Sequence, residues 1–204
     1  MNGNNVKKIL ENWEEIKRFL YPILLPAKSV VREKDISKNF LDLEVCIAVR
    51  FTGSSEPVRV TKETLVKWNI SEWQLYEQAM KNMLGKKPVF CSVEELVERM
   101  VGIRMERKEL QIMILTNDAS RYGAVEMLNL PLLAEYAKKR DCDLYILPTS
   151  IHEVMVVEAM QEVAGRELKS IVMSMNREEV SAEERLSDHV YYFSRKDGKI
   201  SIAA

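Results

Sequence analysis

The sequence lacks most of the features that would direct it to a particular class of partner. Its 30 Lys and Arg residues nearly balance 31 Asp and Glu residues, leaving a formal net charge of -1. Such a balance provides no overall field that would attract nucleic acid or an anionic bilayer. No apolar run approaches the roughly 18 residues that a membrane span needs. We therefore expect neither a nucleic-acid partner nor a membrane partner.

Cysteine is also scarce. Cys46, Cys91 and Cys142 are an odd number, and no two of them have the C-x-x-C spacing. This pattern argues against a disulfide framework and against a cysteine zinc site. Charged residues such as Lys7 and Lys8 interrupt the N-terminal segment, so it does not resemble a signal peptide. We expect a protein of the reducing cytoplasm.

Histidine is limited to His152 and His189, each with an acidic neighbour, Glu153 and Asp188. The zinc-protease motif H-E-x-x-H is absent because position 156 is Val. Two histidines are few for a catalytic zinc, so we predict no metal and no other cofactor. The alternative is a metal-assisted or acid–base hydrolase in which these four residues act together.

Two further segments contain candidate site residues. Ser150, two residues before His152, forms with it a possible nucleophile and base, but the G-x-S-x-G motif is absent, and a hydroxyl-stabilised turn is the simpler interpretation. Asn117 follows an expected strand and is a typical helix-capping residue. If the fold has a ligand pocket, we expect its mouth at Asn117, Arg121 and Tyr122, beside His152.

An apolar stripe at helical spacing marks the N-terminus, and it consists of Val6, Ile9, Trp13, Ile16, Leu20 and Ile23. It predicts an amphipathic helix that packs against the protein's own sheet. The alternative is a seam for a homo-oligomer, although Pro22 makes the stripe short for a coiled coil.

The remaining pattern predicts an α+β fold with a mixed, largely antiparallel sheet covered by helices. In the first half we expect a loop over 28–39, a hairpin of 40–51 with 57–61, and a helix within 70–88 capped by Ser71 and Gln74. A second helix should start at a cap of Ser92 and Glu95 and bury Val93, Leu96, Val97 and Met100. In the second half we expect a strand over 111–117, a helix over 122–141 disturbed at Pro131, strands over 143–148 and 151–159, a helix over 160–175, and a hairpin of 189–196 with 199–204 that turns at Asp197 and Gly198. The strand, helix and strand between 111 and 148 suggest a parallel crossover. We expect one domain over 1–204, with two lobes, 1–105 and 106–204, as the alternative.

Three segments carry a resemblance: ILTNDASRYGA, DLYILPTSIHEVMVV and NREEVSAEERLSDHVYYF. They resemble the bacterial family known as domain of unknown function 5688, over residues 10–204. Because no activity, cofactor or catalytic residue is established for that family, the resemblance implies a shared fold. It also implies that family-specific chemistry or turns lie at Asn117, Tyr122, Gly123, Pro148, Ser150, His152, Glu153, Asp188 and His189. Members usually carry a further N-terminal portion, which we expect this chain to lack.

These observations favour a non-enzymatic cytoplasmic module that binds a protein or a small ligand. The candidate ligand-binding residues are Asn117, Arg121, Tyr122, Ser150, His152, Glu153, Asp188 and His189. The hydrolase is the first alternative, and an oligomer-forming structural protein is the second.

Overall fold

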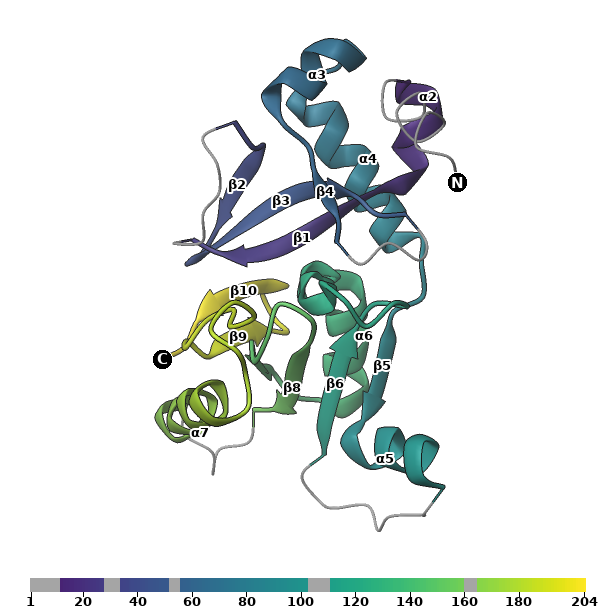
Figure 1. The fold of residues 1–204 in the computed structure, drawn as a ribbon. Helices are drawn as coiled ribbons and strands as arrows, with labels where there is room; N and C mark the ends of the chain where they lie inside the picture. Colours follow the sequence, from purple (N-terminus) through teal and green to yellow (C-terminus); the bar gives the residue numbers. More distant parts are fainter. Residues whose placement is uncertain (1–11, 28–33, 52–55, 103–110, 160–164) are drawn as a thin grey trace. The chain divides into compact units, whose positions relative to one another are not determined.

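The computed structural model describes residues 12–27, 34–51, 56–102, 111–159 and 165–204. The chain forms two compact units, Met1–Lys86 and Lys87–Ala204. Each unit has its own sheet with helices (Figure 1). Every strand pairing among the described residues is antiparallel. The predicted α+β class with a largely antiparallel sheet is therefore confirmed.

The two units divide at Lys86, which is earlier in the chain than the division after residue 105 that the two-lobe alternative placed. Residues 103–110 lie outside the described part of the chain. Whether the whole chain unfolds as one domain stays a prediction.

The elements of the first unit are helix α2 (Trp13–Ile16), the 3-10 helix η1 (Lys17–Phe19), β1 (Leu20–Pro26), β2 (Ser37–Phe40), β3 (Leu43–Val49), β4 (Val58–Arg59), α3 (Lys62–Trp68) and α4 (Glu72–Leu84). Strand β3 is central, with β1 on one side and both β2 and β4 on the other. Helix α4 packs on this sheet through the fully buried Leu75, Ala79 and Met83. The Tyr76 hydroxyl, also on α4, donates to the Val45 carbonyl of β3 at 2.9 Å.

The predicted N-terminal helix is wrong from Leu20 onward. Leu20 and Ile23 belong to β1, where every residue from 20 to 24 is buried. Pro22 lacks a backbone N–H and would break a helix, whereas an edge strand tolerates it, and β1 pairs only with β3 among the described strands. Trp13 and Ile16 do lie on the short helix α2. Val6 and Ile9 lie outside the described residues, so an oligomer seam there stays a prediction.

Other predictions for this unit hold with one exception. The hairpin is confirmed, because β3 and β4 pair antiparallel. The helix after Ser71 is confirmed as α4, with a complete capping box between Ser71 and Gln74. The predicted loop over 28–39 is wrong at its end, since residues 37–40 form β2. The polar side chains of this edge strand showed no apolar pattern, but its backbone pairs with β3.

The elements of the second unit are β5 (Val89–Ser92), α5 (Val93–Val101), β6 (Ile112–Thr116), the 3-10 helix η2 (Gly123–Leu128), α6 (Leu130–Arg140), β7 (Leu144–Leu147), β8 (Val154–Glu158), α7 (Gly165–Glu178), β9 (Tyr191–Ser194) and β10 (Lys199–Ile202). The strands lie in the order β10-β9-β7-β8-β6-β5. Leu168 and Val172 of α7 pack with Val157 of β8. The next residue, Glu158, bonds to Tyr136 of α6. Because neighbouring residues on a strand face opposite ways, α7 and α6 cover opposite faces of this sheet.

Strand β8 lies between β6 and β7 and is antiparallel to both. The antiparallel return after residue 150 is thus confirmed. The suggested parallel crossover is wrong as a direct pairing, because β6 and β7 are not neighbours.

The predicted helix over 122–141 is wrong as a single element, since it divides into η2 and α6 at Asn129. Asn129 accepts from the Leu132 N–H and so begins a new helix, with Pro131 in the first turn, where its missing N–H costs no bond.

Helix α5 begins as predicted, with Ser92 accepting a hydrogen bond from the Glu95 N–H. The expected burial of Met100 is wrong, because its side chain is 77% exposed. Partial burial ends at Val97, so only the first part of α5 packs on the sheet.

The two predicted C-terminal elements are largely confirmed. The helix expected over 160–175 is observed as α7, and residues 160–164 lie outside the described part. The terminal hairpin of β9 and β10 is confirmed. Its turn has a positive φ at Gly198 but not at Asp197. Among the residues that the structure describes, no helix combines the length and apolar content that crossing a membrane requires.

Candidate functional site

The loop of residues 117–122 leaves the end of β6 and leads into η2. Its anchor is Asn117, a buried residue whose side-chain oxygen accepts from the backbone N–H of Ala119 at 3.0 Å and from that of Arg121 at 3.4 Å. The Asn117 amide nitrogen donates to the Arg121 carbonyl at 2.8 Å. One side chain thus satisfies three backbone groups of a tight loop whose residues 118–121 are exposed.

The backbone of this loop is strained at two residues. Ser120 has φ 50 and Tyr122 has φ 52, which lie in the left-handed region that residues with a Cβ rarely adopt. Each such residue costs on the order of 1 kcal/mol and persists only where its surroundings hold it in place. The contacts that fix the loop are therefore essential to its conformation.

Gly123 allows the loop to pass close to the neighbouring chain. A Cβ at this position would lie 2.1 Å from Thr116 Oγ1, 2.6 Å from the Asn117 nitrogen and 2.6 Å from the His152 carbonyl oxygen. Two of these three atoms belong to the backbone, so they cannot move aside as a flexible side chain could. Only glycine permits this approach between the loop and the turn that contains His152.

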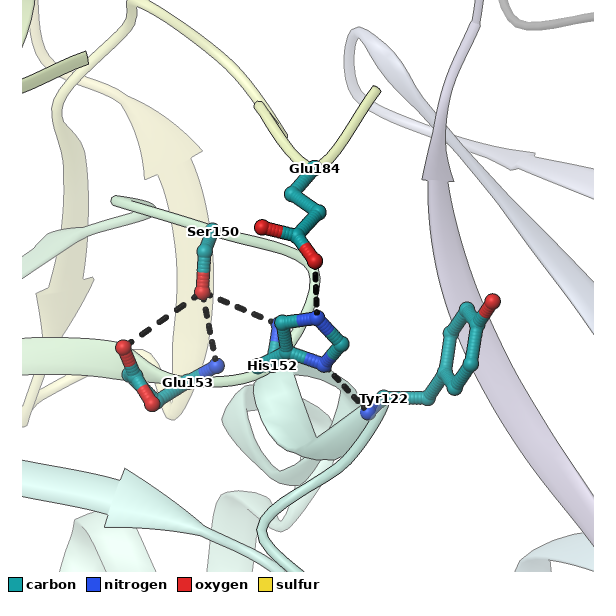
Figure 2. A network of polar contacts seen from close by, with 5 residues as sticks. All are labelled: Tyr122, Ser150, His152, Glu153 and Glu184. Atoms are coloured by element: carbon teal, nitrogen blue, oxygen red, sulfur yellow. Dashed lines mark hydrogen bonds and ion pairs between the residues drawn. The ribbon is translucent and has the colours of Figure 1, made fainter. Parts of the chain in front are cut away.

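That turn, between β7 and β8, is organised by Ser150. Its hydroxyl oxygen accepts from the backbone N–H of His152 at 3.1 Å and from that of Glu153 at 3.3 Å, and it donates to Glu153 Oε1 at 3.5 Å (Figure 2). Ser150 therefore bonds to the backbone of His152 and not to its imidazole. The nucleophile-and-base interpretation of these two residues requires the opposite arrangement.

His152 joins three segments of the second unit. Its carbonyl accepts from Thr116 Oγ1 at 2.7 Å, which attaches the turn to β6. Its ring Nδ1 accepts from the Tyr122 backbone N–H at 3.1 Å, and its Nε2 lies 3.2 Å from Glu184 Oε1 (Figure 2). A nitrogen that accepts carries no proton, so the neutral ring bears its proton on Nε2 and donates it to Glu184. The Tyr122 ring also contacts the imidazole edge to face, with centroids 5.6 Å apart.

Glu184 places a carboxylate against the His152 ring. Hydrogen bonds from His152 and from Ser181, together with the charge of Arg121, lower the pKa of its carboxyl group from the ordinary value. The Glu184 carbonyl also accepts from the Ile151 N–H at 2.8 Å, so backbone and side chain hold the same two segments together. Glu184 itself is about half exposed and His152 mostly buried, at 49% and 19% of their side-chain surfaces.

The structure brings together six of the eight candidate residues, and these are Asn117, Arg121, Tyr122, Ser150, His152 and Glu153. Asp188 and His189 have contacts of their own just before β9. Asp188 accepts from the buried Asn176 of α7 at 2.8 Å, and His189 Nδ1 lies 3.3 Å from Ser187 Oγ.

Sequence reasoning missed Glu184. It lies in a stretch rich in acidic residues, and nothing in that local pattern distinguishes it from Glu183.

A hydrolase built on a metal ion would need at least three suitable side chains around one point. Among the described residues, no group of three or more His, Cys, Asp or Glu side chains could hold a metal ion.

The model of a family of unknown function, DUF5688, matches residues 5–195. Neither the curated proteins nor the solved structures give a match.

Proposed function

Because the chain belongs to DUF5688, a family of unknown function, we propose a role from its own geometry: a non-enzymatic module that binds a partner through the loop of residues 117–122. The observation that carries this proposal is the engagement of His152. Both ring nitrogens are bonded, one to a backbone N–H and one to Glu184, and Ser150 accepts two backbone N–H groups. Side chains with these roles support a loop, whereas a general base must be able to reach a substrate proton.

The exposed part of the loop has the properties of a binding surface. Residues 118–121 are exposed on a backbone that Asn117, His152 and Gly123 hold in one conformation. A loop that is ordered before binding loses less conformational entropy when a partner docks. Arg and Tyr are over-represented among residues that dominate binding energies, which favours Arg121 and Tyr122 as the main contacts. Several successive exposed residues suit a protein partner better than a small molecule, which needs a concave site.

The three thiols support a reducing compartment, and we propose the bacterial cytoplasm. All three cysteines are free, and Cys46 and Cys91 are buried. Burial is the main cause that raises the pKa of Cys46 to about 12 and raises those of Cys91 and Cys142. Thiols in this state react slowly, because the thiolate is the reactive form.

The binding role is tested by site-specific photocrosslinking. A photoreactive amino acid replaces Ala119 on the loop or, as a control, the exposed Glu167 on α7, in cells that naturally produce the protein. A partner captured only from position 119 is then purified, and its affinity is measured by calorimetry. We expect Arg121→Ala to weaken binding about tenfold or more, as for a residue that dominates an interface. Equal affinity of the wild type and Arg121→Ala would contradict the proposed surface.

The hydrolase alternative is tested on the same purified protein. A fluorophosphonate probe labels an activated serine, and metal analysis detects a bound ion. We expect no labelling of Ser150 beyond that of other surface serines. Stoichiometric labelling of Ser150 that disappears in His152→Gln, or turnover of an ester that disappears with it, would overturn the binding proposal.

A further inference from the structure

The two ring nitrogens of His152 have opposite roles, and this makes the ring sensitive to protonation. Nε2 donates to the Glu184 carboxylate, whereas Nδ1 accepts from the backbone N–H of Tyr122. Only the neutral ring can do both, because an imidazolium has a proton on each nitrogen and accepts at neither. When Nδ1 takes a proton from solvent, two N–H groups face each other and the bond to Tyr122 is lost.

The lost bond holds the strained end of the loop. Tyr122 and Ser120 have positive φ angles that persist only under constraint. Asn117, which does not titrate, holds Ala119 and Arg121 in the same loop. The Tyr122 N–H is the loop group that bonds directly to the titratable ring.

Charged groups from three segments lie around the ring. The segment of residues 181–185 provides Glu184, whose carboxylate accepts from Nε2, and Arg185, which donates to the Val180 carbonyl. The loop provides Arg121, whose charge reaches Glu184. The turn provides Glu153, whose carboxylate accepts from Ser150. Glu184 is the one carboxylate of this set bonded to the imidazole, so protonation strengthens that contact while it breaks the contact with Tyr122.

We propose that His152 is a pH-sensitive latch, in which protonation of Nδ1 releases Tyr122 at the end of the loop while Nε2 stays bound to Glu184. Histidine is the side chain that ordinarily changes charge between about pH 5 and 8, so the latch would open on mild acidification. Release of Tyr122 removes one of the contacts that hold the exposed surface described above in one conformation. As a means of regulating binding, the latch rests on the proposed function, but the latch itself can be measured on the protein alone.

Two substitutions separate the two ring contacts. His152→Asn places an amide oxygen near the position of Nδ1, so it keeps an acceptor for the Tyr122 N–H that does not titrate. His152→Gln reaches the position of Nε2 instead, so it keeps the contact with Glu184 and loses the acceptor. His189→Asn serves as the matched control, because it removes the only other histidine.

The measurement is amide hydrogen exchange by NMR at about pH 5.5 and about pH 7.5, corrected for intrinsic rates, alongside titration of the His152 ring proton. In the wild type and in His189→Asn, we expect the Tyr122 amide to lose about tenfold of its protection at the lower pH, the effect of one hydrogen bond. The Tyr122 amide should be protected at both pH values in His152→Asn and at neither pH value in His152→Gln.

Three results would overturn the latch. The first is equal protection of the Tyr122 amide at both pH values while His152 titrates between them. The second is a His152 ring that does not titrate in this range, and the third is a pH response that survives in His152→Asn. Partner binding enters none of these measurements. A failed latch therefore leaves the binding proposal standing, and a failed binding experiment leaves the latch standing.

Discussion

At the residue scale, the second unit uses polar side chains to fix backbone conformation. Asn117 bonds three backbone groups of its loop, Ser150 accepts two backbone N–H groups, and His152 bonds the Tyr122 N–H. A tight turn leaves backbone groups that cannot pair with each other, and a buried group without a partner costs about 1–3 kcal/mol. Residue types that are common in active sites are therefore also the residue types that such turns need.

Gly123 gives the sharpest residue-scale prediction. Gly123→Ala would place a Cβ within 2.6 Å of two backbone atoms, and overpacking of this kind costs about 1–3 kcal/mol of the free energy of unfolding. Gly165→Ala is the matched control, because its Cβ would meet nothing closer than 3.8 Å. Urea denaturation followed by circular dichroism measures both. Equal stability of the two variants would show that the close approach at Gly123 is not present in solution.

Asp143 gives a prediction for pH. Its carboxylate accepts from the Tyr192 hydroxyl and from the Arg195 N–H, and these bonds lower the pKa of Asp143 and, in return, raise that of Tyr192 to about 12. A lowered folded-state pKa contributes stability above the ordinary value of 3.8, and this contribution is lost as the pH falls through the lowered value.

Tyr192→Phe removes the bond from the tyrosine hydroxyl. We expect it to cost about 1 kcal/mol at neutral pH and progressively less below about pH 4. Asp143→Asn should lose a similar amount of the free energy of unfolding at neutral pH. This loss should also shrink toward acid pH, because protonation of Asp143 removes the same stabilisation from the wild type. Urea midpoints between about pH 3 and pH 7 measure the effect. A cost of Tyr192→Phe that stays constant over this range would disprove the link to Asp143 ionisation.

The sequence predicted the candidate site only in part, and the reason is geometric. Asn117, Ser150 and His152 were predictable because strand ends and turns concentrate such residues. Glu184 was not, because its role arises when the 181–185 segment is placed beside the turn by the Ile151 N–H. Asp188 and His189 were grouped with His152 by residue type and by the family resemblance, and their contacts lie with Asn176 and Ser187.

At the scale of elements, local signals were reliable where hydrogen bonds close within a few residues. Ser71 with Gln74 and Ser92 with Glu95 marked the starts of α4 and α5 correctly, because a cap is a contact over three residues. The stripe through Leu20 failed because its apolar spacing also suits a strand buried on both faces, and pairing with β3 decided between the two.

The cap of α4 provides the prediction at this scale. Ser71→Ala removes the acceptor for the Gln74 N–H and should cost about 1 kcal/mol, whereas Ser71→Gly should cost only a few tenths. Glycine is the matched variant because it removes the same hydroxyl but adopts a favourable backbone conformation at the cap. The urea midpoint followed by tryptophan fluorescence gives both values. If the alanine variant is no less stable than the glycine variant, the capping box does not contribute as proposed.

At the scale of the whole molecule, each unit has a buried core of its own. Leu75 in α4 and Leu133 in α6 are both fully buried, one in each unit. All three tryptophans of the chain, Trp13, Trp68 and Trp73, belong to the first unit. Tryptophan fluorescence therefore reports on the first unit alone, while circular dichroism reports on both.

We expect the two units to unfold as separate cooperative transitions. Replacing a buried leucine by alanine costs about 2–5 kcal/mol of the unit that contains it. Leu75→Ala should then lower the urea midpoint seen by fluorescence, and Leu133→Ala should leave that midpoint in place while it lowers part of the circular dichroism transition. One domain over the whole chain makes the opposite prediction, because unfolding would be all-or-none and both variants would move the fluorescence midpoint alike. A shared shift would therefore show that the two compact units form a single folding domain.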